Sequence, residues 1–468
     1  MKDRVRRLNE APFRDNGRYV LYWSQMNRRA HSNHALDFAI ELANERDVPV
    51  LFYEGLTCTY KEANDRLHTF VLEGVPDTAK IASARGVAYA FYLRRRRSDA
   101  NDIVYHLAAQ AEAVVTDDYP VFIANDHNRR VPDRIGVAYF AVDSSCIVPM
   151  NRLEKREYGA YTIRPKLHRL LPEYLCPASE LKPRKRWSAA PFDFHVPVTR
   201  ENIPQLVASC EIDHSVSPST TFRGGSLAAT QHLEDFLRNK LKQYAKGRNE
   251  PSEHATSGLS PYLHFGHISS LEVALRTRKF ASEHSLIADE FLEELIVRRE
   301  LAFNYSRLAK SLDGFDDLPD WARKTMKEHA ADERDPSFTP AQMEAAETYD
   351  PLWNATQKEL LLRGKIHGYY RMYWGKKIIE WSRTYQEALD VMIHLHDRYA
   401  LDGRDPNTYT NILWCFGLHD RAWSERPIFG KLRYMSFAGM KRKTGIDSYI
   451  EEIGELERTR KDRFRITK

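Results

Sequence analysis

The chain has 468 residues, of which 42% are apolar and 29% are charged, and its formal net charge at pH 7 is +5. These proportions are ordinary for a soluble globular protein, and no apolar run approaches the roughly 20 residues that cross a membrane. No apolar stretch follows the basic N-terminus, so we predict no signal peptide and a cytoplasmic protein, located with the nucleoid if bacterial.

The length and the cysteines narrow the architecture and the compartment. A chain of 468 residues is too long for one compact core, so two or three domains are expected. The cysteines are scattered, odd in number and without a C-x-x-C pair, which favours a reducing compartment and predicts no metal site. They are Cys58, Cys146, Cys176, Cys210 and Cys415.

Residues 15–150 alternate between apolar runs and polar stretches that are compatible with helices. One such stretch, 34–47, has clear helical spacing. The apolar runs lie at 18–23, 48–56, 86–93 and 113–124. This alternation predicts a parallel, Rossmann-like α/β sheet. Since no G-x-G-x-x-G motif follows the first run, the dinucleotide fingerprint is absent.

The pattern changes near residue 176. Residues 176–225 are rich in proline and charge and are predicted to be a linker, and helical spacing then continues almost to the end. The predicted organisation is an α/β domain over 1–175, an interdomain linker over 176–225 and an all-α domain over 226–468.

Two short segments at the start of the helical half are compatible with an anion site. Tyr244 and Arg248 lie four residues apart on one predicted helix face. Downstream, hydroxylic residues and Gly258 precede Pro261, a turn that can offer N–H and hydroxyl groups to an anion. Such a turn is also common with no ligand at all.

Three of the eight tryptophans fall within 29 positions. Trp374 and Trp381 are seven residues apart, close to two helical turns, and therefore share a helix face. Trp353 precedes a predicted helix end at Gly364, where the chain can fold back. The spacing leaves two interpretations open, ordinary helix core and a path for electrons, and core is the usual one.

The segment "LDGRDPNTY" at 401–409 concentrates polar side chains, and Trp414 follows it. Its polar residues are Asp402, Arg404, Asp405 and Asn407. Asp-Gly and Asp-Pro form turns, so a surface turn is one interpretation. The other is a polar loop set against a bound heterocycle.

Residues 421–443 hold seven Lys or Arg and one Glu, with aromatic residues interleaved. One interpretation is a solvated basic segment. The other is a nucleic-acid surface, on which basic groups neutralise phosphates and aromatic rings stack on bases.

Long ordered segments spread over nearly the whole chain resemble the class II cyclobutane pyrimidine dimer photolyases of the photolyase/cryptochrome superfamily. They include "YWSQMNRRAHSNHAL", "EYGAYTIRPKLHRLLPEYL", "LSPYLHFGHIS", "DPLWNATQ", "HGYYRMYWGKKIIEWS", "LDGRDPN" and "HDRAWSERPIFGKLRYMSFAGMKRK". The resemblance implies light-driven repair of dimers flipped out of DNA, by one-electron transfer from excited, fully reduced FAD held in the helical domain.

The resemblance also implies roles for individual positions. Those that match the FAD site are Tyr244, Arg248, Thr256, Ser257, Gly258, Leu259, Ser260, Arg371, His396, Asp402 and Asn407. Those that match lesion and DNA contacts are Glu294, Met372, Trp414, Arg421, Trp423, Arg433, Lys441 and Arg442. Trp353, Trp374 and Trp381 match the electron-transfer chain. Arg371 and Asp402 match a salt-bridged pair beside the flavin, and Glu294 matches the acid that hydrogen-bonds the damaged base.

One position departs from the family pattern. The family usually has Asn before the Asp of "L-N-D-(R/K)-Y", whereas this chain has His396 before Asp397. Because histidine titrates near neutral pH, we predict that the one-electron state of the flavin is pH-sensitive here.

The partner is expected to be UV-damaged DNA and the protein a monomer. The α/β domain is compatible with an antenna chromophore, whose presence and identity stay open. The rival interpretations are a cryptochrome-like photoreceptor, a (6-4) photolyase and a DNA-binding protein without enzymatic activity.

Overall fold

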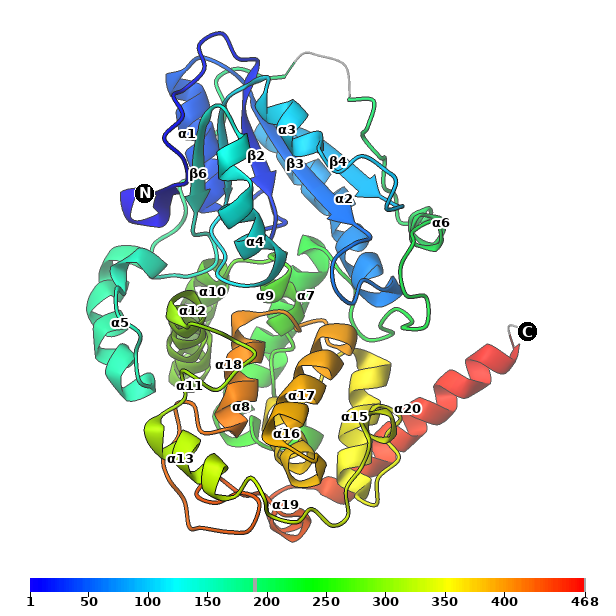
Figure 1. Ribbon diagram of the computed structural model, residues 1–468. Helices are drawn as coiled ribbons and strands as arrows, with labels where there is room; N and C mark the ends of the chain where they lie inside the picture. The colour runs from blue at the N-terminus through cyan, green and yellow to red at the C-terminus, as the bar shows by residue number, and fades with distance from the viewer. Residues whose placement is uncertain (188–191, 467–468) are drawn as a thin grey trace.

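The structure is a computed structural model that describes residues 1–187 and 192–466. It has an α/β part that stands on a larger helical part (Figure 1). The division of the chain at residues 175 and 225 stays a prediction.

The α/β part is built on a sheet of six strands in the order β1-β6-β5-β2-β3-β4. The strands are β1 (Val5–Arg7), β2 (Tyr19–Ser24), β3 (Val50–Thr57), β4 (Ala88–Arg94), β5 (Ala111–Asp117) and β6 (Ala138–Val142). All pairings are parallel except that of β1 with β6. From β2 the chain adds β3 and β4 on one side and then crosses to the other side of β2 to add β5 and β6, as in doubly wound folds. The predicted parallel, Rossmann-like sheet is confirmed.

Helices cover both faces of this sheet, because alternate side chains of each buried strand point to opposite faces. They are α1 (His34–Glu45), α2 (Asp65–Arg85), α3 (Ile103–Ala108) and α4 (Phe122–Arg130). Leu36 and Ile40 of α1 pack on one face with Val20 of β2. Leu107 of α3 packs on the other face with Leu21 of β2.

The apolar run at 113–124 is divided between two elements. Its first half is in β5, which ends at Asp117, and its last residues begin α4 at Phe122.

The Asp117 carboxylate accepts backbone N–H bonds at 2.8–2.9 Å from the three residues that follow β2, Gln25 to Asn27. In a dinucleotide fold such N–H groups would face phosphate, so this loop is closed by the protein's own carboxylate.

The chain reaches the helical part through α5 (Ala160–Tyr174) and a stretch whose regular element is α6 (Ile203–Ala208). Ile163 and Leu167 of α5 pack against Val297 and Leu301 of the helical part.

The helical part has two buried clusters that flank its pocket. Its helices are α7 (Ser226–Asp235), α8 (Leu241–Gly247), α9 (Ser260–His264), α10 (Ser270–Glu283), α11 (Asp289–Leu292), α12 (Arg299–Leu308), α13 (Asp320–Glu328), α14 (Pro340–Glu344), α15 (Pro351–Arg363), α16 (Gly368–Trp381), α17 (Tyr385–Tyr399), α18 (Pro406–Cys415), α19 (Phe437–Lys443) and α20 (Ile446–Ile466). The segments Phe236–Lys240 and Glu293–Arg298 are π-helical. Among the described residues, no helix is both long and apolar enough to span a membrane.

Candidate functional site

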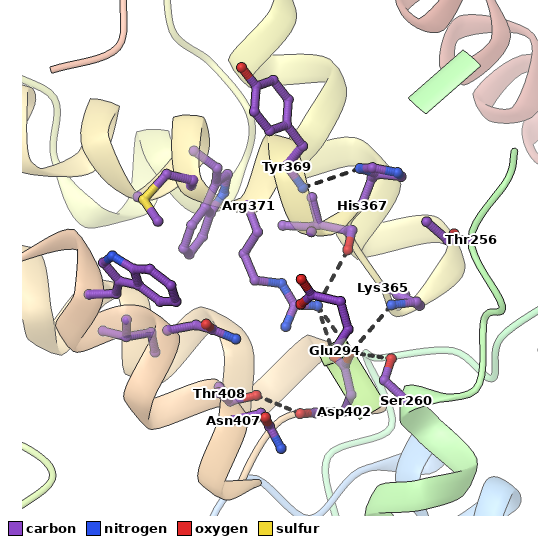
Figure 2. Close-up of a pocket in the computed structure, with 18 of the residues that line it drawn as sticks. Thr256, Ser260, Glu294, Lys365, His367, Tyr369, Arg371, Asp402, Asn407 and Thr408 are labelled. Atoms are coloured by element: carbon purple, nitrogen blue, oxygen red, sulfur yellow. Dashed lines mark hydrogen bonds and ion pairs between the residues drawn. The ribbon is translucent and has the colours of Figure 1, made fainter. Parts of the chain in front are cut away.

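A pocket of about 580 Å³ lies in the helical part, and Figure 2 shows side chains from several helices converging on it. We call it the central pocket. The predicted site residues that line it are Tyr244, Arg248, Thr256, Ser257, Leu259, Ser260, Glu294, Arg371, Met372, Trp374, His396, Asp402, Asn407, Trp414, Trp423 and Arg433. Other predicted residues are not among its lining residues, namely Gly258, Trp353, Trp381, Arg421, Lys441 and Arg442.

Asp402, in the loop between α17 and α18, is the charged centre of the pocket (Figure 2). Its carboxylate accepts from Arg371 of α16 at 3.0 and 3.1 Å and from the Ser260 hydroxyl at 2.7 Å. Lys365, which the sequence interpretation missed, adds an ion pair at 3.5 Å. Burial opposes ionisation, but Arg371 and Lys365 outweigh it and hold the pKa of Asp402 well below its usual range.

The turn before α9 has the predicted shape, but its Ser260 hydroxyl binds Asp402 and is not free for an anion. Gly258 has φ of +68°, a left-handed conformation that glycine adopts without strain. The Ser257 hydroxyl accepts from the backbone N–H of Leu259 at 3.4 Å. The Ser260 hydroxyl is already bonded to Asp402. A pocket ligand would therefore meet mainly Thr256 and Ser257.

Arg248 and Glu294, which were expected to contact different groups, form an ion pair at 2.5 Å. Arg248 caps the C-terminus of α8. Glu294 lies in the π-helical segment Glu293–Arg298, a type of irregularity that is frequent at functional sites. Their side chains are 30% and 40% exposed, so either can exchange its partner for a ligand or for water.

The tryptophans of α15 and α16 form one continuous contact. The rings of Trp353 and Trp374 are parallel, with centroids 6.3 Å apart, and Trp353 meets Trp381 edge to face at 5.3 Å. All three rings are at most 1% exposed. Trp374 also lines the central pocket, so the contact runs from the pocket wall outwards. The structure brings them together, while their role in electron transfer stays a prediction.

His396 lies in the wall of the pocket, but its environment contradicts the expected titration near neutral pH. Burial, reinforced by the positive charge of Arg371, lowers its pKa to about 3. Its Nδ1 donates to the Met392 carbonyl oxygen at 2.9 Å, so the neutral ring has a free acceptor at Nε2. Burial therefore favours the neutral imidazole at this position and opposes the expected titration near neutral pH.

Asp405, named from the sequence only as part of a polar loop, connects the pocket with the α/β part. It accepts from the Tyr119 hydroxyl at 2.7 Å and pairs with His264 at 3.3 Å. Its other oxygen accepts from the backbone and side-chain N–H groups of Asn407, both at 2.8 Å. Asp405 thereby fixes the orientation of Asn407 at the pocket wall.

Residues 421–443, which we call the basic aromatic segment, reach the central pocket through Trp423, a residue that is 36% exposed. The guanidinium groups of Arg421 and Arg433 lie 4.9 and 4.5 Å from its ring centroid. Arg433 also pairs with Asp420 at 3.3 Å. Lys441 and Arg442 are exposed on α19. The segment therefore presents a cation-flanked indole at the pocket and further cations beside it.

The central pocket fits a large polar heterocycle with an anionic arm. Its volume is within the roughly 300–1,000 Å³ of small-molecule sites. Six buried nitrogen atoms of its lining residues have no hydrogen-bond partner among the described residues, a pattern that calls for a ligand or water. They are Arg299 Nε, His367 Nε2, Arg371 Nε, His396 Nε2, Trp414 Nε1 and Arg433 Nε. FAD, with ring atoms that accept and donate hydrogen bonds and with a diphosphate, suits this set, in which His396 Nε2 is an acceptor and the other atoms are donors.

Comparisons with known proteins give consistent results. A family model described as DNA photolyase matches residues 20–185. Proteins named deoxyribodipyrimidine photo-lyase are similar over nearly the whole chain. The one from Methanothermobacter thermautotrophicus is 39% identical over 97% of this chain and 98% of its own. Those from Arabidopsis thaliana and Potorous tridactylus are 37% and 34% identical, over 93% and 97% of this chain and 89% and 85% of theirs.

Solved structures support the fold. A class III photolyase from Agrobacterium tumefaciens matches with a TM-score of 0.66 at 18% identity, over 93% of this chain and 86% of its own. A cryptochrome from Synechocystis matches with a TM-score of 0.66 at 14% identity, over 92% of this chain and 87% of its own. The predicted fold class, an α/β domain followed by a helical one, is confirmed.

Proposed function

The chain belongs to the DNA photolyase family, and from that premise we propose that it splits cyclobutane pyrimidine dimers in DNA, as a class II enzyme. The family is one of light-driven DNA-repair flavoproteins that bind FAD. The finer assignment of lesion, class and mechanism is our proposal.

The observation that carries the proposal is the composition of the central pocket. A single cavity is lined by Arg371, Asp402 and His396, which suit a flavin, and by Met372 and Trp423. A flavin and a flipped pyrimidine dimer could therefore occupy one site. Bound FAD, when fully reduced and excited by light, supplies one electron to the dimer and recovers it after the ring has opened.

The residues of the chain bind, orient and balance charge around that chemistry. Arg371 and Lys365, with Asp402 between them, place a net positive charge beside the ring site, which favours a reduced, anionic flavin. We assign Arg248 to the phosphates and Glu294 to the lesion, although the two side chains form an ion pair with each other in the ligand-free pocket. We propose that their ion pair opens when the ligands bind.

DNA recognition is assigned to the basic aromatic segment. Enzymes that act on a base in a duplex, photolyases among them, take the nucleotide out of the stack at a cost of a few kcal/mol. Trp423, held between Arg421 and Arg433, can fill the gap and replace lost stacking. Arg433, Lys441 and Arg442 would neutralise phosphates.

A second pocket, of about 500 Å³, lies at the carboxyl ends of β2 and β3 and is lined by Trp23, Tyr53, Tyr92 and His127. Ligands of open α/β sheets bind at this edge. We propose it as the site of an antenna chromophore whose identity stays open. Absorption spectroscopy of the cofactors extracted from purified protein tests this.

The deciding experiment irradiates purified, reduced protein with an oligonucleotide that contains one thymine dimer. We expect loss of the dimer in the light and none in the dark. A matched oligonucleotide with a (6-4) photoproduct should stay unrepaired. Repair of the (6-4) product alone would favour that alternative, and binding without repair of either would favour a cryptochrome-like photoreceptor. We also predict that the protein acts as a monomer and that it is located in the compartment that holds the cell's DNA.

A further inference from the structure

The tryptophan contact does not end at a buried ring, because Tyr349 continues it to the surface. Tyr349 directly precedes Asp350, which caps the N-terminus of α15. Its ring centroid lies 5.6 Å from that of Trp381, at 69°. Trp381 is 1% exposed, whereas Tyr349 is 58% exposed. The aromatic path therefore extends from the wall of the central pocket through Trp374, Trp353 and Trp381 to a phenol in contact with water.

Trp381 is poorly suited to be the last donor. An oxidised indole is stabilised by passing on its N–H proton or by leaving the positive charge to solvent. Trp353 and Trp374 donate their indole N–H groups to the Trp374 carbonyl oxygen and to Gln357, at 3.0 and 2.9 Å. The indole N–H of Trp381 has no partner among the described residues.

The charge near Trp381 also favours onward transfer. The Lys377 ammonium lies 5.5 Å from the centroid of its ring and would repel a cation radical there. The pairing of Lys377 with Glu380, at 2.8 Å, reduces this repulsion without removing the charge from the ring face. A tyrosine that loses an electron also loses its phenolic proton, so its radical is neutral and escapes the repulsion.

Tyr349 is well placed among the aromatic neighbours of Trp381. In the described part of the chain, Trp381 has ring contacts with Trp353, Tyr349 and Phe338. Phe338, at 5.1 Å, has no readily oxidised group. A phenol in the position of Tyr349 can give its electron to Trp381 and its proton to water.

We propose that Tyr349 is the terminal electron donor of the tryptophan chain. This inference rests on the proposed function, because it needs photoexcited, oxidised flavin as the oxidant. One electron moves from Trp374 to the flavin, and the positive charge passes to Trp353 and then to Trp381. Tyr349 supplies one electron to Trp381 and releases one proton to water. The net result is a flavin reduced by one electron, a neutral tyrosyl radical and one proton in solvent, with all three tryptophans restored.

The test uses the FAD-loaded, oxidised protein, with transient absorption and electron paramagnetic resonance after a blue-light flash. In the unaltered protein, a tryptophan radical should decay into a neutral tyrosyl radical. The Tyr349→Phe variant should lose the tyrosyl signal, while its tryptophan radical persists until it recombines. Tyr161→Phe is the matched control, since Tyr161 is 66% exposed and its ring contact is with Tyr158. A tyrosyl signal regained in Tyr349→Phe with Phe338→Tyr would add support.

The outcomes separate this inference from the proposed function. An equal tyrosyl yield in Tyr349→Phe would overturn the inference, as would a tryptophan radical that forms in the unaltered protein without a tyrosyl radical after it. In both cases the tryptophan chain stands. If the flash gives no tryptophan radical and Trp381→Phe photoreduces normally, the chain itself fails, and the role of Tyr349 fails with it.

Discussion

Arg371 donates from a single Nη2 to both carboxylate oxygens of Asp402, at 3.0 and 3.1 Å, inside the pocket wall. Asp402→Asn would leave Arg371 and Lys365 buried without a counter-charge. Because breaking a buried pair costs about 3–5 kcal/mol, we expect a loss of that order in the free energy of unfolding. Urea titration at pH 7 measures it. Asp390→Asn, at an exposed position, should change little, and equal stability of the two variants would contradict the assignment.

The same pair has a consequence for acid stability. The pKa of Asp402 is held below the unfolded value of about 3.9. When folding lowers the pKa of a carboxyl group, that group stabilises the folded state fully at pH values above its pKa in the unfolded state. The stabilisation is lost as the pH falls towards the pKa of the group in the folded state. The stability gap between the unaltered protein and Asp402→Asn should therefore be constant from neutral pH down to about 4 and narrow below it.

Trp374→Phe and Trp381→Phe should each slow light-driven reduction of oxidised FAD sharply. Both changes remove an oxidisable indole and nearly keep the volume of the side chain. Steady illumination with absorption spectroscopy follows the reduction. Repair by protein reduced chemically beforehand should persist, because that reaction bypasses the chain. Trp321→Phe, in the helical part but outside the three-ring contact, is the control. Unchanged photoreduction in both variants would make the tryptophans ordinary core.

The sequence predicted those parts of the molecule that local pattern determines. The buried runs that became β2 and β3 were visible as apolar stretches, and the αL helix end at Gly364 was visible as a glycine stop. The spacing of Trp374 and Trp381 indicated one helix face. Their contact with Trp353 depends on how α15 folds back on α16. The spacing alone could not distinguish such a contact from ordinary helix core.

The rest depended on contacts between distant residues. Tyr119 and Asp405 are 286 positions apart and meet only because the α/β part rests on the helical part. Lys365 joins Asp402 from a loop with no motif of its own. The pairing of Arg248 with Glu294 likewise arises from two separate helices. Residue identity can suggest a charge at such positions, but the fold decides which opposite charge it meets.

Glu294→Ala should lower the quantum yield of dimer splitting and leave the affinity for damaged DNA nearly unchanged. A carboxyl group beside the dimer can stabilise the negative charge that develops there by donating a hydrogen bond when it is protonated, which requires that Glu294 leaves its ion pair with Arg248. Single-turnover repair and a binding titration measure the two quantities. Glu293→Ala is the matched control, since the neighbouring Glu293 pairs with Arg164 instead of Arg248. Lost affinity with an intact yield would refute the role.

Lys441→Ala and Trp423→Ala should weaken DNA binding in different ways. Lys441 is exposed, so its loss should weaken damaged and undamaged DNA alike and reduce the slope of log K against log salt by about one. Trp423→Ala should reduce the preference for dimer-containing DNA by roughly 1–3 kcal/mol, the value of one stacking contact, without changing the slope.

Fluorescence anisotropy at several salt concentrations separates the two effects. Arg433→Ala isolates the phosphate contact less cleanly than Lys441→Ala, because Arg433 also lies against the ring of Trp423. If Trp423→Ala weakens both DNAs equally, Trp423 does not fill the gap beside the lesion.

His396 should affect acid stability and leave the flavin's behaviour near neutral pH unchanged. With its pKa lowered to about 3 by burial, the ring stays neutral from pH 5.5 to 8.5, on either side of the reference value of about 6.5. Photoreduction across that range should have the same pH profile in the unaltered protein and in His396→Asn. A profile that flattens only in the variant would mean that the histidine titrates there after all.

The unfolded state, in contrast, binds a proton at His396 below about pH 6.5 while the folded state does not. The stabilising contribution of the neutral ring is therefore complete above that pH and declines as the pH falls towards the folded value of about 3. By pH 5 the decline amounts to about 2 kcal/mol for this one group. Urea titrations at pH 7 and pH 5 should show the unaltered protein losing more stability than His396→Asn. An equal loss in both would mean that another buried group governs the acid limit.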